Sequence, residues 1–293
     1  MTGERGLPYY YTRDPEKLFR LKFISYLHAG FYAHGSFLMK KICVAAFTAA
    51  VLMSAVSLTF PIHKQPGNTR VESFSRAKKF LMKKVYYDHR TTIYCGCSYS
   101  EDKTVARETC GYIPKRAGKR ARRVEWEHVV PAHAFGQSFR EWREGDPVCV
   151  NSRGRKFKGR RCATKANRLF RYMQADMYNL YPAIGEVNME RSNYSMAMIP
   201  GEKREFGACD IEIENRKVEP RPDVRGDIAR TYFYMEAAYP GRGIISRKNR
   251  PLFMAWNRAD PVDKWECRRA QRIFRIHGNR NNIVMDACAA AGL

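Results

Sequence analysis

The chain has 293 residues, and its 53 Lys and Arg against 29 Asp and Glu give a formal net charge of +24 at pH 7. Hydrophobic residues make up 44% of it and aromatic residues 13%, so it can build a packed core and is not a disordered polycation. A mean hydropathy of −0.54 and a single long apolar run exclude a protein with several membrane spans. A foldable chain with a pI near 9.8 is expected to bind a polyanion: nucleic acid, an acidic membrane surface or acidic glycans.

The apolar run, residues 42–56, follows Lys40 and Lys41 and ends in small residues that permit cleavage after Ser57. A basic segment, an apolar segment of this length and a small-residue exit predict a secretory signal peptide. The alternative is a membrane anchor, but a helix that spans a bilayer needs about 20 apolar residues. We therefore expect the protein to be exported.

Met39 stands directly before this signal, although a signal peptide is read from the N-terminus of the nascent chain. We therefore expect residues 1–38 to be an upstream segment and residues 39–57 to be the signal. The alternative is a cytosolic extension that delays export. With cleavage after Ser57, residues 58–293 are expected to form the mature protein. Residues 1–57 hold 7 of the basic and 3 of the acidic side chains, so the mature chain keeps a net charge of +20.

The cysteines bear on the redox compartment. Cys43 falls in the predicted signal, and eight others follow it: Cys95, Cys97, Cys110, Cys149, Cys162, Cys209, Cys267 and Cys288. An even number in an exported chain predicts up to four disulfides, whose pairing the sequence does not determine. Zinc binding is the alternative, but Cys95 and Cys97 are separated by one residue rather than two, and no second close pair follows.

The first half of the mature chain alternates helix, strand and loop patterns. Residues 69–89 place apolar side chains at helical spacing and predict a helix. Residues 91–97 are β-branched and aromatic, which predicts a strand that enters a turn. Six of the ten residues 114–123 are basic and predict a solvated loop, whereas residues 124–130 predict a strand that Pro131 ends.

The second half is richer in helix patterns. Residues 152–171 contain nine Lys or Arg and no acid; their glycines predict a loop, which becomes a helix from Thr164 to Met177. Further helices are predicted at residues 224–239, 263–276 and 282–291. Because there is no repeat, low-complexity tract or Gly/Ser linker, the pattern indicates one mature domain of the α+β class.

The run V-E-W-E-H-V-V-P-A at residues 124–132 places His128 beside Glu125 and Glu127. A histidine can act as a general base near neutral pH, and a neighbouring carboxylate can hold a divalent ion. The alternative is a core histidine with satisfied hydrogen bonds. Adjacent residues of a regular strand point to opposite faces, so Glu127 and His128 can share a site only if the strand is bulged or ends there. Pro131 favours an end.

A second run, residues 175–193, contains Asn179, Asn188 and Asn193. Asparagines in such a run can simply cap helices and shape turns, and taken alone they indicate nothing more.

Together the two runs resemble the bacterial endonuclease I family of exported, nonspecific nucleases. The matching pieces are E-W-E-H-V-V-P-A at residues 125–132, D-M-Y-N-L-Y-P-A-I-G-E-V-N at 176–188, R-S-N at 191–193, I-A-R-T-Y-F-Y-M at 228–235 and W-E-C at 265–267. The resemblance covers the chain from about residue 72 to its end. It implies a disulfide-stapled domain with a ββα-metal core, in which two strands and a helix hold one divalent ion.

The resemblance also implies roles for individual residues. His128 is expected to be the general base and Glu127 a metal ligand from the strand. The helix ligand is an asparagine, assigned here to Asn179 with Asn188 as the alternative.

An arginine is expected to assist at the phosphate. Its candidates are Arg160, Arg161 and Arg168, which the sequence does not separate, and Arg168 is the working assignment.

The implied reaction is hydrolysis of DNA, with RNA as a second candidate substrate, to 5′-phosphate ends by a periplasmic or secreted monomer that uses Mg²⁺ or Mn²⁺. The basic loops are expected to bind backbone phosphates without reading bases, through Arg153, Arg155, Lys156, Lys158, Arg160 and Arg161. A non-enzymatic adhesin or DNA-uptake binder would explain the charge and the export signal but not a Glu-His strand. A glycan hydrolase would need two carboxylates further apart than Glu125 and Glu127.

Overall fold

The structure, a computed structural model, describes residues 65–201 and 203–293. The expected upstream segment and signal, residues 1–57 with Cys43, lie outside these residues. In the part of the chain that is described, no helix has the length and apolar character needed to cross a bilayer. The described residues build one hydrophobic core to which most of the helices and strands contribute.

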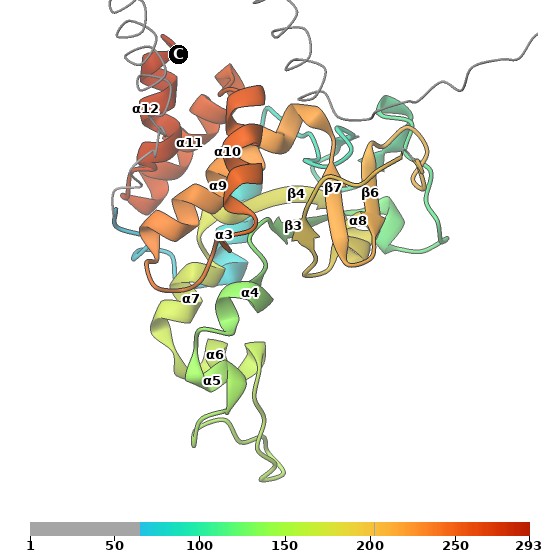
Figure 1. The fold of residues 1–293 in the computed structure, drawn as a ribbon. Helices are drawn as coiled ribbons and strands as arrows, with labels where there is room; N and C mark the ends of the chain where they lie inside the picture. Colours follow the sequence, from blue (N-terminus) through green and yellow to red (C-terminus); the bar gives the residue numbers. More distant parts are fainter. Residues whose placement is uncertain (1–64, 202) are drawn as a thin grey trace, which may run out of the picture. The chain divides into compact units, whose positions relative to one another are not determined.

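A pair of antiparallel strands and one helix lie at the centre of the fold (Figure 1). β3 (Val124–His128) pairs with β4 (Leu180–Ile184), and Glu127 lies opposite Tyr181. β4 leads without a loop into α8 (Gly185–Arg191). β4 is buried along its whole length, which fits its nearly continuous apolar sequence. The predicted strand at residues 124–130 and the α+β class are confirmed.

The C-terminal helices gather on one side of the β3–β4 pair (Figure 1). They are α9 (Arg225–Ala238), α10 (Arg250–Ala259), α11 (Lys264–His277) and α12 (Asn282–Ala290). α9 packs against α10 and α12, and α11 packs against α12. The helices predicted at residues 224–239, 263–276 and 282–291 are confirmed to within one residue at each end, whereas α10 was not predicted.

The helix predicted at residues 69–89 is present but shorter. α3 (Phe74–Phe80) continues as the π-helical turn η1 (Leu81–Val85). The helix begins only after Ser73, whose hydroxyl oxygen accepts a hydrogen bond from the backbone N–H of Arg76 at 3.3 Å.

The strand predicted at residues 91–97 is wrong. This segment forms a tight turn in which the backbone N–H of Gly96 donates to the carbonyl of Thr92 at 2.9 Å. Gly96 has φ +68°, a left-handed conformation that a β-branched or aromatic residue would adopt only with strain. The first strands, β1 (Ser98–Tyr99) and β2 (Val105–Ala106), pair just after this turn.

Short helices fill the connection between β3 and β4. They are α4 (Ala132–Gly136), α5 (Arg140–Arg143), α6 (Arg160–Ala166), α7 (Arg168–Gln174) and η4 (Met177–Asn179). The helix predicted from Thr164 to Met177 is interrupted at Asn167, whose backbone is extended and whose side chain accepts from the N–H of Phe170 at 3.0 Å. The basic loop lies between α5 and α6 and projects away from the central strands (Figure 1).

A second sheet and several single turns complete the fold. The sheet consists of β5 (Ser195–Met196), β7 (Lys217–Pro220) and β6 (Ile211–Glu214), with β7 between a parallel β5 and an antiparallel β6. The turns are η2 (Arg107–Thr109), η3 (Arg120–Arg122) and η5 (Pro222–Val224). Apart from η3, the basic run at residues 114–123 contains no helix or strand, as predicted.

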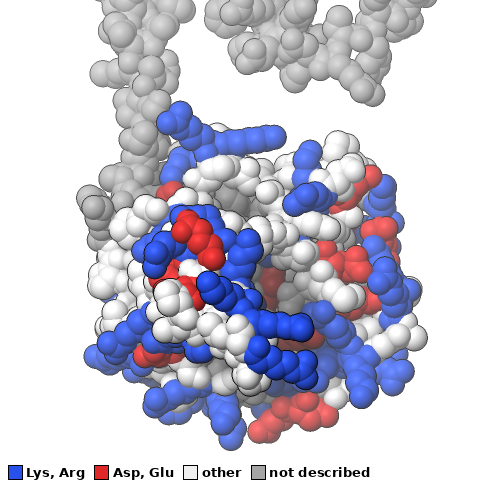
Figure 2. Space-filling view, turned by 90° about the horizontal axis from the view of Figure 1, so that it is seen from below, with Lys and Arg blue, Asp and Glu red and all other residues white. Residues whose placement is uncertain are grey.

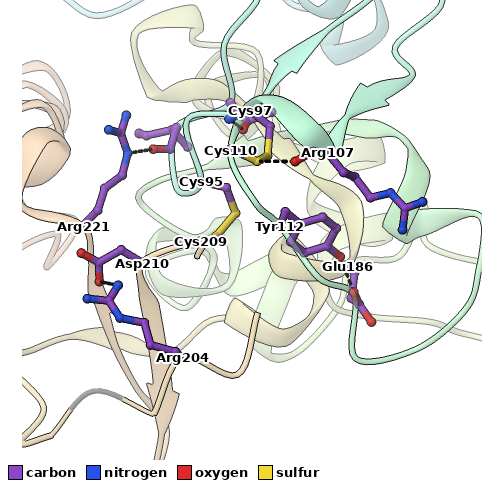
Figure 3. The surroundings of a disulfide bond; sticks show 12 residues. Cys95, Cys97, Arg107, Cys110, Tyr112, Glu186, Arg204, Cys209, Asp210 and Arg221 are labelled. Carbon is purple, nitrogen blue, oxygen red and sulfur yellow. Dashed lines mark hydrogen bonds and ion pairs between the residues drawn. A yellow bond between two sulfur atoms is a disulfide. The ribbon is translucent and has the colours of Figure 1, made fainter. Parts of the chain in front are cut away.

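The eight cysteines that follow the signal form four disulfides. The pairs are Cys95–Cys209, Cys97–Cys110, Cys149–Cys162 and Cys267–Cys288. The prediction of disulfides rather than zinc ligands is therefore confirmed. Figure 3 shows that the Cys95–Cys209 bond joins the turn before β1 to the segment before β6, close to Tyr112, whose hydroxyl donates to Glu186 of α8. All four disulfides join segments outside β3, β4 and α8 to one another, and the contact with α8 near Cys95–Cys209 is the hydrogen bond from Tyr112 to Glu186.

Candidate active site

A cleft of about 710 Å³ opens beside β3. β3 contributes Glu125, Glu127 and His128 to its lining, and α8 contributes Asn188 and Arg191. Five further cations line it from surrounding segments: Lys78, Lys103, Arg120, Arg123 and Arg160. In Figure 2, Lys and Arg cover more of the face that is shown than Asp and Glu do. The cleft therefore combines a few acidic and polar groups with many cations, which suits a polyanionic substrate.

His128 lies at the end of β3, and its ring packs against Phe74 at a centroid distance of 5.0 Å. Its Nε2 is 2.9 Å from the carbonyl oxygen of Gln174. Because a carbonyl can only accept, Nε2 carries the proton and the neutral ring keeps its lone pair on Nδ1. Burial, and then the charge of Arg160, lower the pKa of His128 to about 3. The ring is thus an unprotonated base at neutral pH.

Glu127 precedes His128 and lines the same cleft. β3 ends at His128, which is one of the two conditions under which neighbouring strand residues can reach one site. Glu127 Oε1 accepts from the hydroxyl of Tyr94 at 2.8 Å and lies 3.2 Å from Nη1 of Arg191. Burial raises the pKa of Glu127, and the charge of Arg191 opposes that shift. The side chain is therefore held in place by two groups on separate segments.

Arg191, at the end of α8, is fully buried. Its guanidinium donates to the carbonyl oxygens of Val129 at 2.6 Å and His128 at 3.3 Å. It therefore fixes the backbone directly after β3 as well as the carboxylate of Glu127. The sequence patterns assigned no role to Arg191 or to Tyr94, although Arg191 opens the R-S-N piece of the resemblance.

The two candidate asparagines have different surroundings. Asn179 is fully buried in η4; its Oδ1 accepts from the N–H of Val130 at 2.7 Å and its Nδ2 donates to the carbonyl of Val130 at 2.9 Å. It does not line the cleft. Asn188 does, and its Nδ2 donates to Glu125 Oε2 at 3.2 Å. The structure thus brings Asn188, rather than Asn179, together with Glu127 and His128.

The three candidate arginines also differ in whether they line the cleft. Arg160 lines the cleft, and its Nε donates to the side-chain oxygen of Gln174 at 2.7 Å. Gln174 therefore contacts both Arg160, through its side chain, and His128, through its backbone. Arg161 stacks over Phe157 and Arg168 lies 3.5 Å from Glu72; neither of these arginines lines the cleft.

The other predicted phosphate-binding residues lie on the basic loop between α5 and α6, residues 144–159, which is called the projecting loop below. Arg153, Arg155, Lys156 and Lys158 are exposed and do not line the cleft. The Cys149–Cys162 disulfide closes the base of this loop. Lys78 and Lys103 line the cleft without having been predicted, because single lysines in a chain so rich in Lys and Arg carry no distinguishing pattern.

The donor atoms in the cleft suit a hard divalent cation. Glu127 offers a carboxylate and Asn188 an amide oxygen, the ligand types that Mg²⁺ prefers. Among residues 65–201 and 203–293, no cluster of three or more His, Cys, Asp or Glu side chains forms a metal site. A pair of oxygen donors, Glu127 and Asn188, fits an ion that is held by few protein ligands and keeps several waters.

The chain matches a known protein family over most of its length. The sequence profile of the family described as Endonuclease I matches residues 69–288. The chain belongs to the endonuclease I family. This confirms both the predicted family and the predicted enzyme class, an endonuclease.

Three similar proteins illustrate the relationship. A periplasmic deoxyribonuclease of Aeromonas hydrophila is 41% identical over 240 residues, which cover 80% of this chain and 94% of the relative. An extracellular deoxyribonuclease of the same species is 39% identical over 249 residues, covering 83% and 97%. Endonuclease-1 of Buchnera aphidicola from Acyrthosiphon pisum is 37% identical over 223 residues, covering 74% and 82%.

Proposed function

We propose that this endonuclease is exported to the periplasm or the medium and hydrolyses DNA without sequence preference, with His128 as its general base and one divalent ion, Mg²⁺ or Mn²⁺, bound by Glu127 and Asn188. The names of the relatives support the substrate and the location. The observation that carries the mechanism is the neutral His128, with its Nδ1 lone pair, in the cleft that Glu127 and Asn188 also line.

His128 removes the proton of the attacking water through Nδ1, while the Nε2–H bond to Gln174 keeps the ring in the required tautomer. The water oxygen bonds to phosphorus as the bond to the 3′ oxygen breaks, and the departing oxygen takes a proton from solvent, which leaves a 5′-phosphate and a 3′-hydroxyl. When bound, the ion supplies positive charge for the phosphate oxygens and the departing oxygen. Arg160, which lines the same cleft, binds a nonbridging phosphate oxygen.

The remaining cations of the cleft and the projecting loop bind the flanking phosphates. Contacts to phosphates provide affinity and register but carry no sequence information. RNA has the same phosphodiester backbone and remains a second candidate substrate, and the enzyme acts as a monomer. A DNA-uptake binder without activity would use the same cations but would not need a neutral histidine beside a carboxylate.

The test is cleavage of plasmid DNA by wild-type protein and by His128→Ala, with and without chelator. His128→Ala should reduce the rate by about 100-fold or more while DNA binding persists. The matched control is His89→Ala, because His89 stacks on Trp265 at 3.8 Å and does not line the cleft. Near-normal cleavage by His128→Ala, or cleavage unaffected by chelator, would show the mechanism to be wrong.

A further inference from the structure

The amide of Asn188 has a donor end and an acceptor end, and only its oxygen can bind a cation. Nδ2 of Asn188 lies 3.2 Å from Oε2 of Glu125. An ionised carboxylate only accepts hydrogen bonds, so the NH₂ group must be the end that faces Glu125. This hydrogen bond occupies the NH₂ group of Asn188 and leaves Oδ1 as the end that is available to the cleft.

Glu125 is itself fixed. Arg120 donates to both of its oxygens, from Nε to Oε1 at 2.9 Å and from Nη2 to Oε2 at 2.5 Å. Such a two-pronged arginine–carboxylate pair holds the plane of the carboxylate as well as its position. Both oxygens of Glu125 thus have donors, which makes this carboxylate a poor candidate for a metal ligand of its own.

The first residue of α8 lets this pair approach the helix. A Cβ on Gly185 would lie 2.8 Å from the carbonyl oxygen of Arg120 and 2.9 Å from Oε1 of Glu125. Any side chain there would therefore push the Arg120–Glu125 pair away from α8, the helix that carries Asn188.

We propose that Glu125, locked by Arg120, is a positioning residue that orients the amide of Asn188 so that Oδ1 binds the divalent ion. This inference rests on the proposed role of Asn188 as a metal ligand. It assigns to Glu125 a function in metal binding without direct contact with the metal.

Glu125→Gln breaks this arrangement at almost constant size. Arg120 needs a hydrogen-bond acceptor at the positions of both Oε1 and Oε2 of Glu125. Asn188 needs an acceptor at the position of Oε2. The glutamine side chain has one oxygen only, so its NH₂ group must face either the guanidinium or Nδ2 of Asn188. If the NH₂ group of the glutamine faces Nδ2 of Asn188, the amide of Asn188 turns or loses its partner. If it faces Nε of Arg120, Asn188 keeps an acceptor, but Arg120 no longer fixes that acceptor. Either arrangement orients Oδ1 of Asn188 less well, and we expect Mn²⁺ affinity to fall about tenfold or more, the usual range when the partner of a metal ligand is removed.

The decisive measurement is the same substitution in two backgrounds. In an Asn188→Asp background, the side chain at position 188 has two acceptor oxygens and no donor. Its negative charge is repelled by that of Glu125. There Glu125→Gln should leave Mn²⁺ affinity unchanged or raise it, because the new NH₂ group donates to the aspartate and the repulsion disappears. Glu125 acting only on stability would instead lower the affinity in both backgrounds.

Mn²⁺ binding is measured by electron paramagnetic resonance on the full-length mature protein without DNA, so that the readout is independent of cleavage. The control is Glu236→Gln, which disturbs another arginine–carboxylate pair, in which Nη2 of Arg250 contacts both oxygens of Glu236 at 2.7 Å, outside the cleft lining. It should leave the affinity unchanged. Thermal unfolding of each variant verifies folding.

The outcomes separate this inference from the proposed function. Weak Mn²⁺ binding by Asn188→Ala together with normal binding by Glu125→Gln would overturn the positioning role and leave Asn188 as the ligand. Normal binding by Asn188→Ala would overturn the ligand assignment itself. An equal loss from Glu125→Gln in both backgrounds would also overturn the positioning role.

Discussion

One backbone carbonyl determines the tautomer of His128. Gln174 uses its carbonyl oxygen to hold Nε2–H of His128 at 2.9 Å and its side-chain oxygen to hold Nε of Arg160 at 2.7 Å. The proposed base and the proposed phosphate-binding cation are therefore both held by a single residue at the end of α7. Because Gln174 is the last residue of this short helix, small shifts of α7 would move both groups together.

The two asparagines should behave differently when truncated. Asn179→Ala removes the partners of both the N–H and the carbonyl of Val130, which are left without those bonds in the core. We expect it to lower the free energy of unfolding by about 2–4 kcal/mol and to leave the Mg²⁺ requirement of the folded enzyme unchanged. Asn188→Ala should raise the Mg²⁺ concentration needed for half-maximal activity with a much smaller effect on stability.

Urea denaturation and Mg²⁺ titration of cleavage measure the two effects separately. If Asn179→Ala raised the Mg²⁺ requirement and Asn188→Ala did not, Asn179 would be the ligand, as the sequence resemblance first suggested.

Among the helices and strands, those whose limits are set by residues close together in the sequence could be predicted. Two of the C-terminal helices that were predicted closely, α11 and α12, follow capping residues; the carboxylate of Asp263, for example, accepts from the N–H of Glu266 at 2.6 Å at the start of α11. At residues 91–97 the predicted turn is present but the predicted strand is not, because the β-branched composition favours a strand whereas Gly96 and the cysteine cross-links impose a turn over the whole segment. The sequence could not show that Asn179 is bonded in the core, because its partner, Val130, is 49 residues away in the sequence.

Asn167 provides a test of the break between α6 and α7. Its side chain caps α7 by accepting from the N–H of Phe170 and also donates to Glu141 at 3.0 Å. Asn167→Ala should cost about 1 kcal/mol or somewhat more of unfolding free energy, the typical value of an N-cap. The control is Gln271→Ala on the exposed face of α11. An unfolding midpoint equal to that of the control would mean that packing, rather than the cap, starts α7.

At the scale of the whole molecule, acid should weaken folding through a second buried histidine. His277 is buried on α11, and neither of its ring nitrogens makes a hydrogen bond among the described residues; Nδ1 lies 3.7 Å from Asp176. Burial lowers the pKa of His277 to about 4, against the opposing charge of Asp176. Between pH 6.5 and about 4 the unfolded chain binds a proton that the folded chain does not, so this contribution to stability is complete above pH 6.5 and is lost as the pH falls.

The prediction is a difference between wild type and His277→Phe. From pH 6.5 to pH 4.5, wild type should lose about 1.4 kcal/mol per pH unit relative to the variant in unfolding free energy. The comparison must be relative, because burial raises the pKa values of Asp227 and Glu266, and these carboxyl groups favour the folded state on acidification. Parallel stability curves for the two proteins would show that His277 does not titrate as described.

Residues 58–293 carry a net charge of +20, and the cations of the projecting loop allow a test of whether part of this charge binds DNA directly. Arg153, Arg155, Lys156 and Lys158 are exposed on a loop whose base is closed by the Cys149–Cys162 disulfide. If they bind phosphates, replacing all four with Ser should reduce the slope of log affinity against log salt by about 0.9 for each phosphate of duplex DNA that is no longer neutralised. Binding is measured at several salt concentrations in the His128→Ala background, which prevents cleavage.

A matched control separates direct binding at this loop from the general effect of charge. Removing four exposed cations elsewhere, by changing Lys83, Lys84, Arg268 and Arg275 to Ser, lowers the net charge by the same amount. A long-range effect of net charge would flatten the salt dependence equally in both proteins, whereas direct phosphate binding would flatten it mainly in the loop variant. Because the loop lies outside the cleft, its loss should weaken binding to all sequences alike and change cleavage at saturating DNA much less. An unchanged slope in the loop variant would mean that the loop does not touch DNA.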